Sequence, residues 1–187
     1  MNTLATHFTQ KELPYTGVEL RPHFLLSQFD LKGSALAAFI GPCHVDTEHL
    51  VDWEDRIASD RIEAKKMVHF IGEFFGMPLE AGVFMQRLFI ATLRDLVSAC
   101  YNGKCERLGD DLFVSDRKLS VSIVTASPVS ILMHTGINID PAGAPVPAIG
   151  LSELSIEPPA FARKALQAFS AEWEGIQWAR VKVRPVI

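Results

Sequence analysis

A lysine and a pair of carboxylates stand close together in the middle of this sequence. Asp110 and Asp111 shortly precede Lys118, and two hydroxyl residues, Ser120 and Ser122, follow the lysine. An ammonium group above a floor of small hydroxyls can contact a carboxylate, a phosphate or an acyl carbonyl. We therefore expect Lys118 to be a catalytic group and the other four residues to bind a ligand.

Alternation of apolar and polar residues predicts how this segment is positioned. Strands over 111–114 and 118–124, joined through Ser115 and Asp116, would pair Phe113 with Lys118. We expect the apolar face to hold Leu112, Val114, Leu119, Val121 and Ile123. We expect the polar face, above which the ligand lies, to hold Asp111, Phe113, Lys118, Ser120 and Ser122. The alternative is a solvated face, which is common in antiparallel sheets.

His69 and Glu73 are candidates for proton transfer. On a strand over 67–75 both share a face, where His69 would act as acid or base and Glu73 would orient it. The alternative is a buried structural pair. His134 is either a residue of the same pocket, which we favour, or a strand residue bonded to its neighbours.

Cys43 is a candidate nucleophile for acyl transfer, with Lys118 polarising the carbonyl group. The alternative is a buried, inert thiol. Arg87, near the start of a predicted helix, is a candidate anchor for an anion together with the helix dipole, or else lies on a solvated face.

Histidine and carboxylate residues are concentrated between residues 43 and 55. The group comprises Cys43, His44, Asp46, Glu48, His49, Asp52, Glu54 and Asp55. These side chains suit zinc, manganese or iron, which gives a metal-dependent hydrolase or lyase as one hypothesis. Their spacing matches no standard metal signature, so we assign no metal ligand. The alternative is a loop that closes over the pocket and contacts the ligand, His44 included.

Composition limits the class of protein. The 187 residues are 48% hydrophobic and 21% charged, which fits a single globular domain over 1–187 with a loosely ordered segment at 1–20. The net charge is −4 and no basic stripe is present, so long nucleic acids are not expected as partners. The odd set of three cysteines and the absence of a leader predict reduced thiols in the cytoplasm. The apolar stretch 34–43 is too short to cross a membrane.

Hydrophobic periodicity predicts the order of elements. We expect helices over 22–31, 81–100 and from Pro158 onward, the second with Phe84, Leu88, Thr92, Leu96 and Cys100 on its apolar face and the third burying Phe161, Ala165, Phe169 and Trp173. We expect strands over 34–40, 67–75, 111–114, 118–125, 130–140, 148–156 and 180–186, with a hairpin loop over 141–145. Residues 67–75 fit a helix as well, although Gly72 weakens it. These blocks indicate an α+β fold with a mainly antiparallel sheet.

The segment Asp110–Leu119 resembles the central motif of biotin and lipoate protein ligases, in which an aspartate precedes a lysine at the same spacing. Asp111 and Lys118 fall on these positions. The segment Gly136–Asp140 resembles the Gly-Ile-Asn-Val-Asn strand of the biotin enzymes, which adds Gly136 and Asn138 as expected ligand contacts. Over nearly its whole length the chain also resembles an uncharacterised family, the domains of unknown function numbered 366. Segments 41–45, 51–55, 69–73, 86–88 and 118–123 carry this resemblance.

The resemblance implies the fold of the class II synthetases and biotin ligases, with helices packed on one face of the sheet. It implies a small acid, acyl group or nucleotide bound on the sheet, acyl or ligase-type transfer, and ATP as a possible cofactor. The glycine-rich basic loop of the ligases has no counterpart here, so the alternative is a non-catalytic binder that has lost this loop. We also expect a homodimer that pairs through a strand over 180–186.

Overall fold

The computed structural model describes residues 3–186, and a five-stranded sheet in this range organises the chain. Its strands, in spatial order, are β1 (Ala5–Phe8), β2 (Ala35–Val45), β3 (Ile62–Phe74), β8 (Ile131–Asp140) and β7 (Ser120–Ala126). Only the β1–β2 pair among these described strands is parallel. The predicted α+β class with a mainly antiparallel sheet is therefore confirmed.

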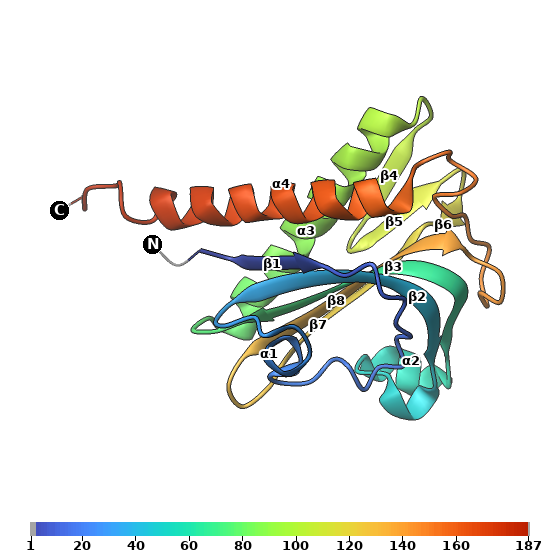
Figure 1. Cartoon of the computed structure of the whole chain (residues 1–187), viewed down its shortest axis with the longest axis horizontal. Helices are drawn as coiled ribbons and strands as arrows, with labels where there is room; N and C mark the ends of the chain where they lie inside the picture. The colour runs from blue at the N-terminus through green and yellow to red at the C-terminus, as the bar shows by residue number, and fades with distance from the viewer. Residues whose placement is uncertain (1–2, 187) are drawn as a thin grey trace.

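The long helices α3 (Leu79–Cys100) and α4 (Pro158–Ala179) cover one face of this sheet (Figure 1). They bury a continuous apolar core in which Phe89 contacts Phe70 and Phe169 edge-on. α4 buries Phe161, Ala165, Phe169 and Trp173, as the helical spacing predicted. Among the described residues, no helix is long and apolar enough to cross a membrane.

The opposite face carries the short helices α1 (Phe24–Phe29) and α2 (Trp53–Ala58) and the 3₁₀ helix η1 (Thr47–His49) (Figure 1). A smaller apolar cluster lies on this side, with Phe39, Met67 and Ile71 as its centre. Because side chains alternate along a strand, His69 and His134 also face this side.

A second sheet of the described chain, β4 (Cys105–Leu108), β5 (Asp111–Val114) and β6 (Arg117–Lys118), leads into β7. Phe113 pairs with Lys118, as predicted, across a two-residue turn in which Ser115 and Asp116 both have positive φ. Such turns match the twist of a hairpin, and Asp tolerates this backbone conformation. β4 was not predicted.

The predicted hairpin faces are only half right. Leu112, Val114 and Leu119 are in the helix-side core, as expected. At Leu119 the chain passes from the second sheet to the first, and its alternation changes sides. Val121 consequently packs on the side opposite the helices, whereas the Ser122 hydroxyl bonds to Gln86 of α3 at 3.1 Å.

The buried face of α3 was predicted wrongly. Its buried residues are Gly82, Met85, Gln86, Phe89, Ile90, Leu93 and Val97. Phe84 is 64% exposed and Cys100 is also exposed. The predicted stripe, at every fourth residue from Phe84, also contains large apolar side chains, so periodicity did not distinguish it from the stripe that is buried. α3 packs against β7 and α4, and these tertiary contacts decide which stripe is buried.

Residues 3–20, the described part of the segment 1–20 for which loose structure was expected, pair with β2 at several points. β1 pairs with β2, and further along Tyr15 and β2 exchange backbone hydrogen bonds through Pro42 and His44. Gly41 permits this course, because a Cβ atom there would lie 1.8 Å from the Leu13 carbonyl oxygen.

Several element boundaries also differ from prediction. β2 continues through a bulge at Gly41 to Val45, and β3 confirms the strand interpretation of 67–75. Residues 148–156 form turns with a single bridge from Ala148 to Lys118, so 141–145 is not a hairpin loop. Residues 180–186 form no strand, since a turn at 180–181 is followed by irregular backbone.

Candidate functional site

A cavity of about 370 Å³ opens on the sheet face opposite α3 and α4. This volume is within the usual range for small-molecule sites. Its walls come from the end of β2, from β3, the β5–β6 hairpin, β7 and β8, and from the N-terminal segment, the η1–α2 region and the loop after β8. The apolar lining residues are Leu20, Val45, Leu50, Val51, Ile62, Met67, Val121, Ile123, Ala144, Pro145, Val146 and Ala148.

Lys118 and Asp111 form an ion pair in the cavity wall, with 2.9 Å between Nζ and Oδ2. The Lys118 side chain keeps 30% of its exposure and that of Asp111 keeps 27%. Burial raises the pKa of Asp111, while the adjacent Lys118 opposes the rise. Asp111 uses one of three ammonium hydrogens, so Lys118 can still donate to a ligand.

Asp110 faces a different partner from its neighbour. Its carboxylate contacts the Arg87 guanidinium and the Gln86 amide, each at 2.9 Å. Asp110 borders the cavity, but Arg87 does not. Arg87 is therefore not placed to anchor an anion, as had been expected. Its guanidinium is already paired with Asp110, and it lies two turns beyond the start of α3, too far for the helix dipole to assist.

Ser120 and Ser122 border the cavity, yet their hydroxyls are bonded elsewhere. Ser120 Oγ accepts from the backbone N–H of Leu112 at 2.8 Å, and Ser122 Oγ bonds to Gln86 and Thr135. Both hydroxyls therefore hold β7 to its neighbours. The polar floor expected beneath Lys118 is replaced by the apolar side chains of Val121 and Ile123.

His134 lies in the cavity wall, and His69 lies directly behind it. His134 Nε2 is 3.1 Å from His69 Nδ1, and His69 Nε2 is 3.3 Å from the Gly41 carbonyl oxygen. Tyr15, which also lines the cavity, stacks on the His134 ring with a centroid distance of 3.7 Å. Burial lowers the pKa of His69 to about 4 and lowers that of His134 well below its usual value.

Glu73 is not the partner of His69. Its carboxylate accepts from the backbone N–H of His23 at 2.9 Å and from the Ser130 hydroxyl at 2.8 Å. Both residues are on β3 and face the same side, as predicted, but residues four apart on a strand are separated by about 13 Å. His69 therefore bonds to His134, and Glu73 bonds to His23 and Ser130.

Asn138 and Gly136 follow His134 on the same face of β8. Asn138 lines the cavity, and its amide donates to the Lys118 carbonyl oxygen at 3.2 Å. Gly136 does not line the cavity. A Cβ atom at this position would lie 2.7 Å from the Met67 methyl carbon, so the glycine lets Met67 pack across β8.

Cys43 and His44 lie outside the cavity wall. Cys43 is buried, and burial raises the pKa of its thiol to about 12, which keeps it protonated at neutral pH. His44 is exposed and pairs with Asp46 at 3.2 Å. Neither geometry supports the role expected for a nucleophile or a ligand contact.

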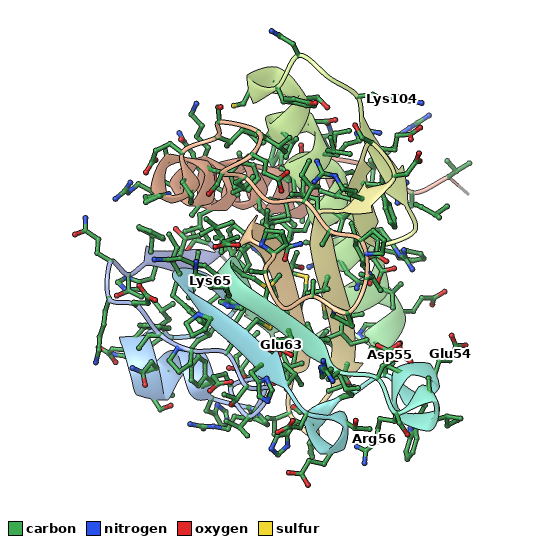
Figure 2. All side chains as sticks on the ribbon, turned by 90° about the vertical axis from the view of Figure 1, so that its right-hand side faces the viewer. Glu54, Asp55, Arg56, Glu63, Lys65 and Lys104 are labelled. Atoms are coloured by element: carbon green, nitrogen blue, oxygen red, sulfur yellow. The ribbon has the colours of Figure 1, made fainter. Side chains whose placement is uncertain are left out.

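The acidic segment after β2 borders the cavity, as the loop-closure alternative predicted. Asp55 of α2 lies on the side of the helix nearer the strands, whereas Glu54 lies on the far side (Figure 2). Burial raises the pKa of Asp55, and the carboxylates of Asp52 and Asp60 raise it further. No group of three His, Cys, Asp or Glu side chains within residues 3–186 is arranged to hold a metal ion.

Tyr15, Asp60 and the loop at 144–148 were missed by sequence reasoning. Nothing in the local sequence distinguishes Tyr15, because Phe8 and Leu13 are also large apolar residues of the N-terminal stretch. Its position depends on pairing with β2, which is not visible in local sequence.

Solved structures with a similar fold fall into two groups. A protein of unknown function from Pyrococcus horikoshi has a TM-score of 0.94 and 37% identity, covering 99% of this chain and 100% of that one. A biotin protein ligase from Aquifex aeolicus, in complex with biotin and ATP, has a TM-score of 0.59 and 13% identity, covering 92% and 71%. A putative lipoate protein ligase from T. acidophilum, with bound lipoic acid, has a TM-score of 0.57 and 10% identity, covering 92% and 87%. The ligase-like fold predicted from the sequence is confirmed.

A curated relative and a family model agree with these structures. An uncharacterized protein of Methanocaldococcus jannaschii is 33% identical over 156 residues, which are 80% of this chain and 70% of the relative. The family model described as "Domain of unknown function (DUF366)" matches residues 4–184. The chain therefore belongs to this family of unknown function, with the fold of biotin and lipoate protein ligases.

Proposed function

We propose that the protein binds a small organic molecule in the cavity, with a carbonyl, acyl or carboxylate group of that molecule facing Lys118. The observation that carries this proposal is the Lys118–Asp111 pair in the wall of a cavity of about 370 Å³. Asp111 fixes the ammonium group and leaves hydrogens free to donate. Val121, Ile123 and Met67 supply the apolar surface for the rest of the ligand.

The charges around the cavity favour a carbonyl group over a phosphate. Among the described residues, six carboxylates line the cavity, those of Asp52, Asp55, Asp60, Glu63, Asp110 and Asp111. The cations in the lining are Arg61 and Lys118, and each already has a carboxylate partner. A nucleotide triphosphate would bring further negative charge into this site. ATP therefore has no electrostatic support from these residues.

Acyl or ligase-type transfer is the catalytic form of this function, and the ligase-like fold supports it. A second form, a non-catalytic binder, is favoured by the state of the candidate reactive groups. Cys43 is buried with a raised pKa, and the His69 imidazole has no carboxylate partner. A metal-dependent hydrolase has no support from the placement of the described side chains.

A thermal-shift screen tests the binding proposal, with octanamide, octanoate, lipoate, biotin and ATP as probes. A ligand at 100 times its dissociation constant stabilises a protein by about 2.7 kcal/mol. We expect stabilisation by at least one of the acyl probes and its loss in Lys118→Met. The control is Lys65→Met, because Lys65 is on β3, is exposed and pairs with Asp140 at 2.8 Å (Figure 2). Equal binding by Lys118→Met and wild type would refute the role of Lys118.

Turnover separates the enzyme from the binder. A probe that stabilises the protein and is also converted, as monitored by mass spectrometry, supports the transferase. A probe that stabilises without conversion supports the binder.

The described cysteines are all free thiols, which agrees with the proposed cytoplasmic location. The homodimer stays a prediction, and the strand through which it was expected to form is absent from residues 180–186.

A further inference from the structure

The His134 side chain is held in the cavity wall by rigid contacts on two sides. Only 2% of the residue is exposed. Tyr15 stacks on one face of the ring, with an angle of 7° between the two planes. His69 bonds to its Nε2 atom at 3.1 Å. These contacts fix both the plane and the rotation of the imidazole.

The hydrogen-bond chain determines which ring nitrogens carry protons. The Gly41 carbonyl can only accept, so His69 Nε2 donates to it. A neutral His69 then has an unprotonated Nδ1, which must accept from His134 Nε2. A neutral His134 is left with an unprotonated Nδ1, which is a hydrogen-bond acceptor.

Both rings are neutral at physiological pH, because burial lowers both pKa values. The chain ends at a backbone carbonyl. In a catalytic triad, by contrast, a carboxylate behind the histidine stabilises the imidazolium that forms during proton transfer. His134 and His69 lack such a carboxylate among their contacts. The arrangement therefore suits a fixed hydrogen-bond acceptor better than a general base.

The Nδ1 atom of His134 has no hydrogen-bond partner among residues 3–186. At the same time, no buried side-chain nitrogen or oxygen in that range is left unpaired. Nδ1 consequently keeps some accessible surface, and the residue that carries it lines the cavity. A rigidly held acceptor that is accessible in the cavity and has no partner in the protein is available to a donor on the ligand.

We propose that the ligand presents an N–H or O–H group to His134 Nδ1, and that it is a neutral or cationic molecule, which narrows the proposed function to a carbonyl or acyl group at Lys118. The carboxylates around the cavity fit the same class of ligand, because they too accept hydrogen bonds and disfavour anions. This inference rests on the proposed function, since it concerns the same cavity. It adds the chemistry of a second contact point, distinct from the carbonyl group at Lys118.

Nitrogen NMR of the histidine-labelled full chain tests the proton positions without any ligand. We expect His134 and His69 both to show a protonated Nε2 and an unprotonated Nδ1 at neutral pH. A spectrum with a proton on His134 Nδ1 would overturn the inference and would leave the proposed role of Lys118 untouched.

Matched probes test the ligand contact itself. The probes are straight-chain amides that end in a hydroxyl group, over a range of chain lengths, and the methyl ether of each. Each amide offers Lys118 a carbonyl, whereas only the free hydroxyl can donate to Nδ1. We expect the hydroxyl compound of the best-fitting length to bind about tenfold more tightly than its ether, which corresponds to about 1.4 kcal/mol.

Two variants assign this difference to His134. His134→Phe should bind both members of a pair equally, while His44→Phe should keep the tenfold preference because His44 is exposed and outside the cavity. The wild-type comparison needs no variant, so it decides even if His134→Phe does not fold. Equal affinity of hydroxyl and ether at every length refutes the inference alone. Failure of every amide, and of octanoate, lipoate and biotin, to bind the wild type refutes the proposed function as well.

Discussion

The two faces of the five-stranded sheet differ in what they bury. On the face covered by α3 and α4, aromatic and aliphatic side chains such as Phe70, Phe89 and Phe169 pack against each other. On the opposite face, His69, His134 and Glu73 are almost completely buried beside a smaller apolar cluster. The helix face thus stabilises the fold, whereas burial of polar groups on the opposite face carries a free-energy cost of desolvation. The proposed binding site lies on this second face, which carries the cavity.

The largest effect is expected on the helix face. Phe89→Ala removes a fully buried ring in contact with Phe70 and Phe169, and should lower the free energy of unfolding by about 4 kcal/mol. Urea denaturation measures the change. The control on the same helix is Phe84→Ala, which should cost less than about 1 kcal/mol because Phe84 is 64% exposed. Similar losses in both variants would contradict the corrected face of α3.

The next effect, on the opposite face, is a loss of stability in acid. The folded pKa of His69 is about 4 against an unfolded value of 6.5, so the unfolded chain binds a proton that the folded chain excludes. Stability should therefore be complete above pH 6.5 and should fall by about 3 kcal/mol for His69 alone as the pH drops toward 4. His134 shifts in the same direction. A proton NMR titration of His69 with a midpoint near 6.5 would contradict this expectation.

Glu73 should matter for stability but not for binding. Glu73→Gln weakens the hydrogen bonds from His23 N–H and the Ser130 hydroxyl, with an expected loss of about 2 kcal/mol of unfolding free energy. Glu63→Gln is the control, because its pair with Arg61 is half-exposed and should contribute less than about 1 kcal/mol. We expect Glu73→Gln to bind an acyl probe with unchanged affinity. A loss of affinity at normal stability would contradict this prediction and would show that Glu73 contributes to binding.

The smallest effect on stability is expected for Lys118→Met. The Lys118–Asp111 pair is partly exposed, so its removal should change the free energy of unfolding by less than about 1 kcal/mol. Chemical denaturation of Lys118→Met and Lys65→Met measures this change. A large loss of stability in Lys118→Met alone would mean that the pair is mainly structural, and would weaken the contrast between the two faces.

Local sequence patterns predicted much of the fold. The helix at Pro158 depends on a clear apolar spacing, and the pairing of Phe113 with Lys118 depends on contacts between residues near one another in the chain. Residues 67–75 fitted a strand or a helix, and pairing with β2 and β8 makes them a strand. The ligase-like fold was expected from the resemblance of the segment Asp110–Leu119 to the central motif of the ligases.

The features that were predicted wrongly are decided by contacts between residues distant in the chain. The expected pair of His69 and Glu73 does not form, because residues four apart on a strand do not touch, while His134 lies beside His69 across the β3–β8 pair. The faces of β7 were reversed because a change of sheet at Leu119 leaves no mark in the apolar pattern.

The sequence by itself determined the class of fold, the order of its principal elements and the lysine–aspartate hairpin, because these depend on side-chain periodicity and turn chemistry. Tertiary structure alone decided that Tyr15 stacks on His134, that Asp110 and Asp111 take separate partners, and that acidic side chains of α2 border the cavity. Those contacts join segments distant in the chain, and their geometry is set by sheet register and core packing, which no local pattern encodes.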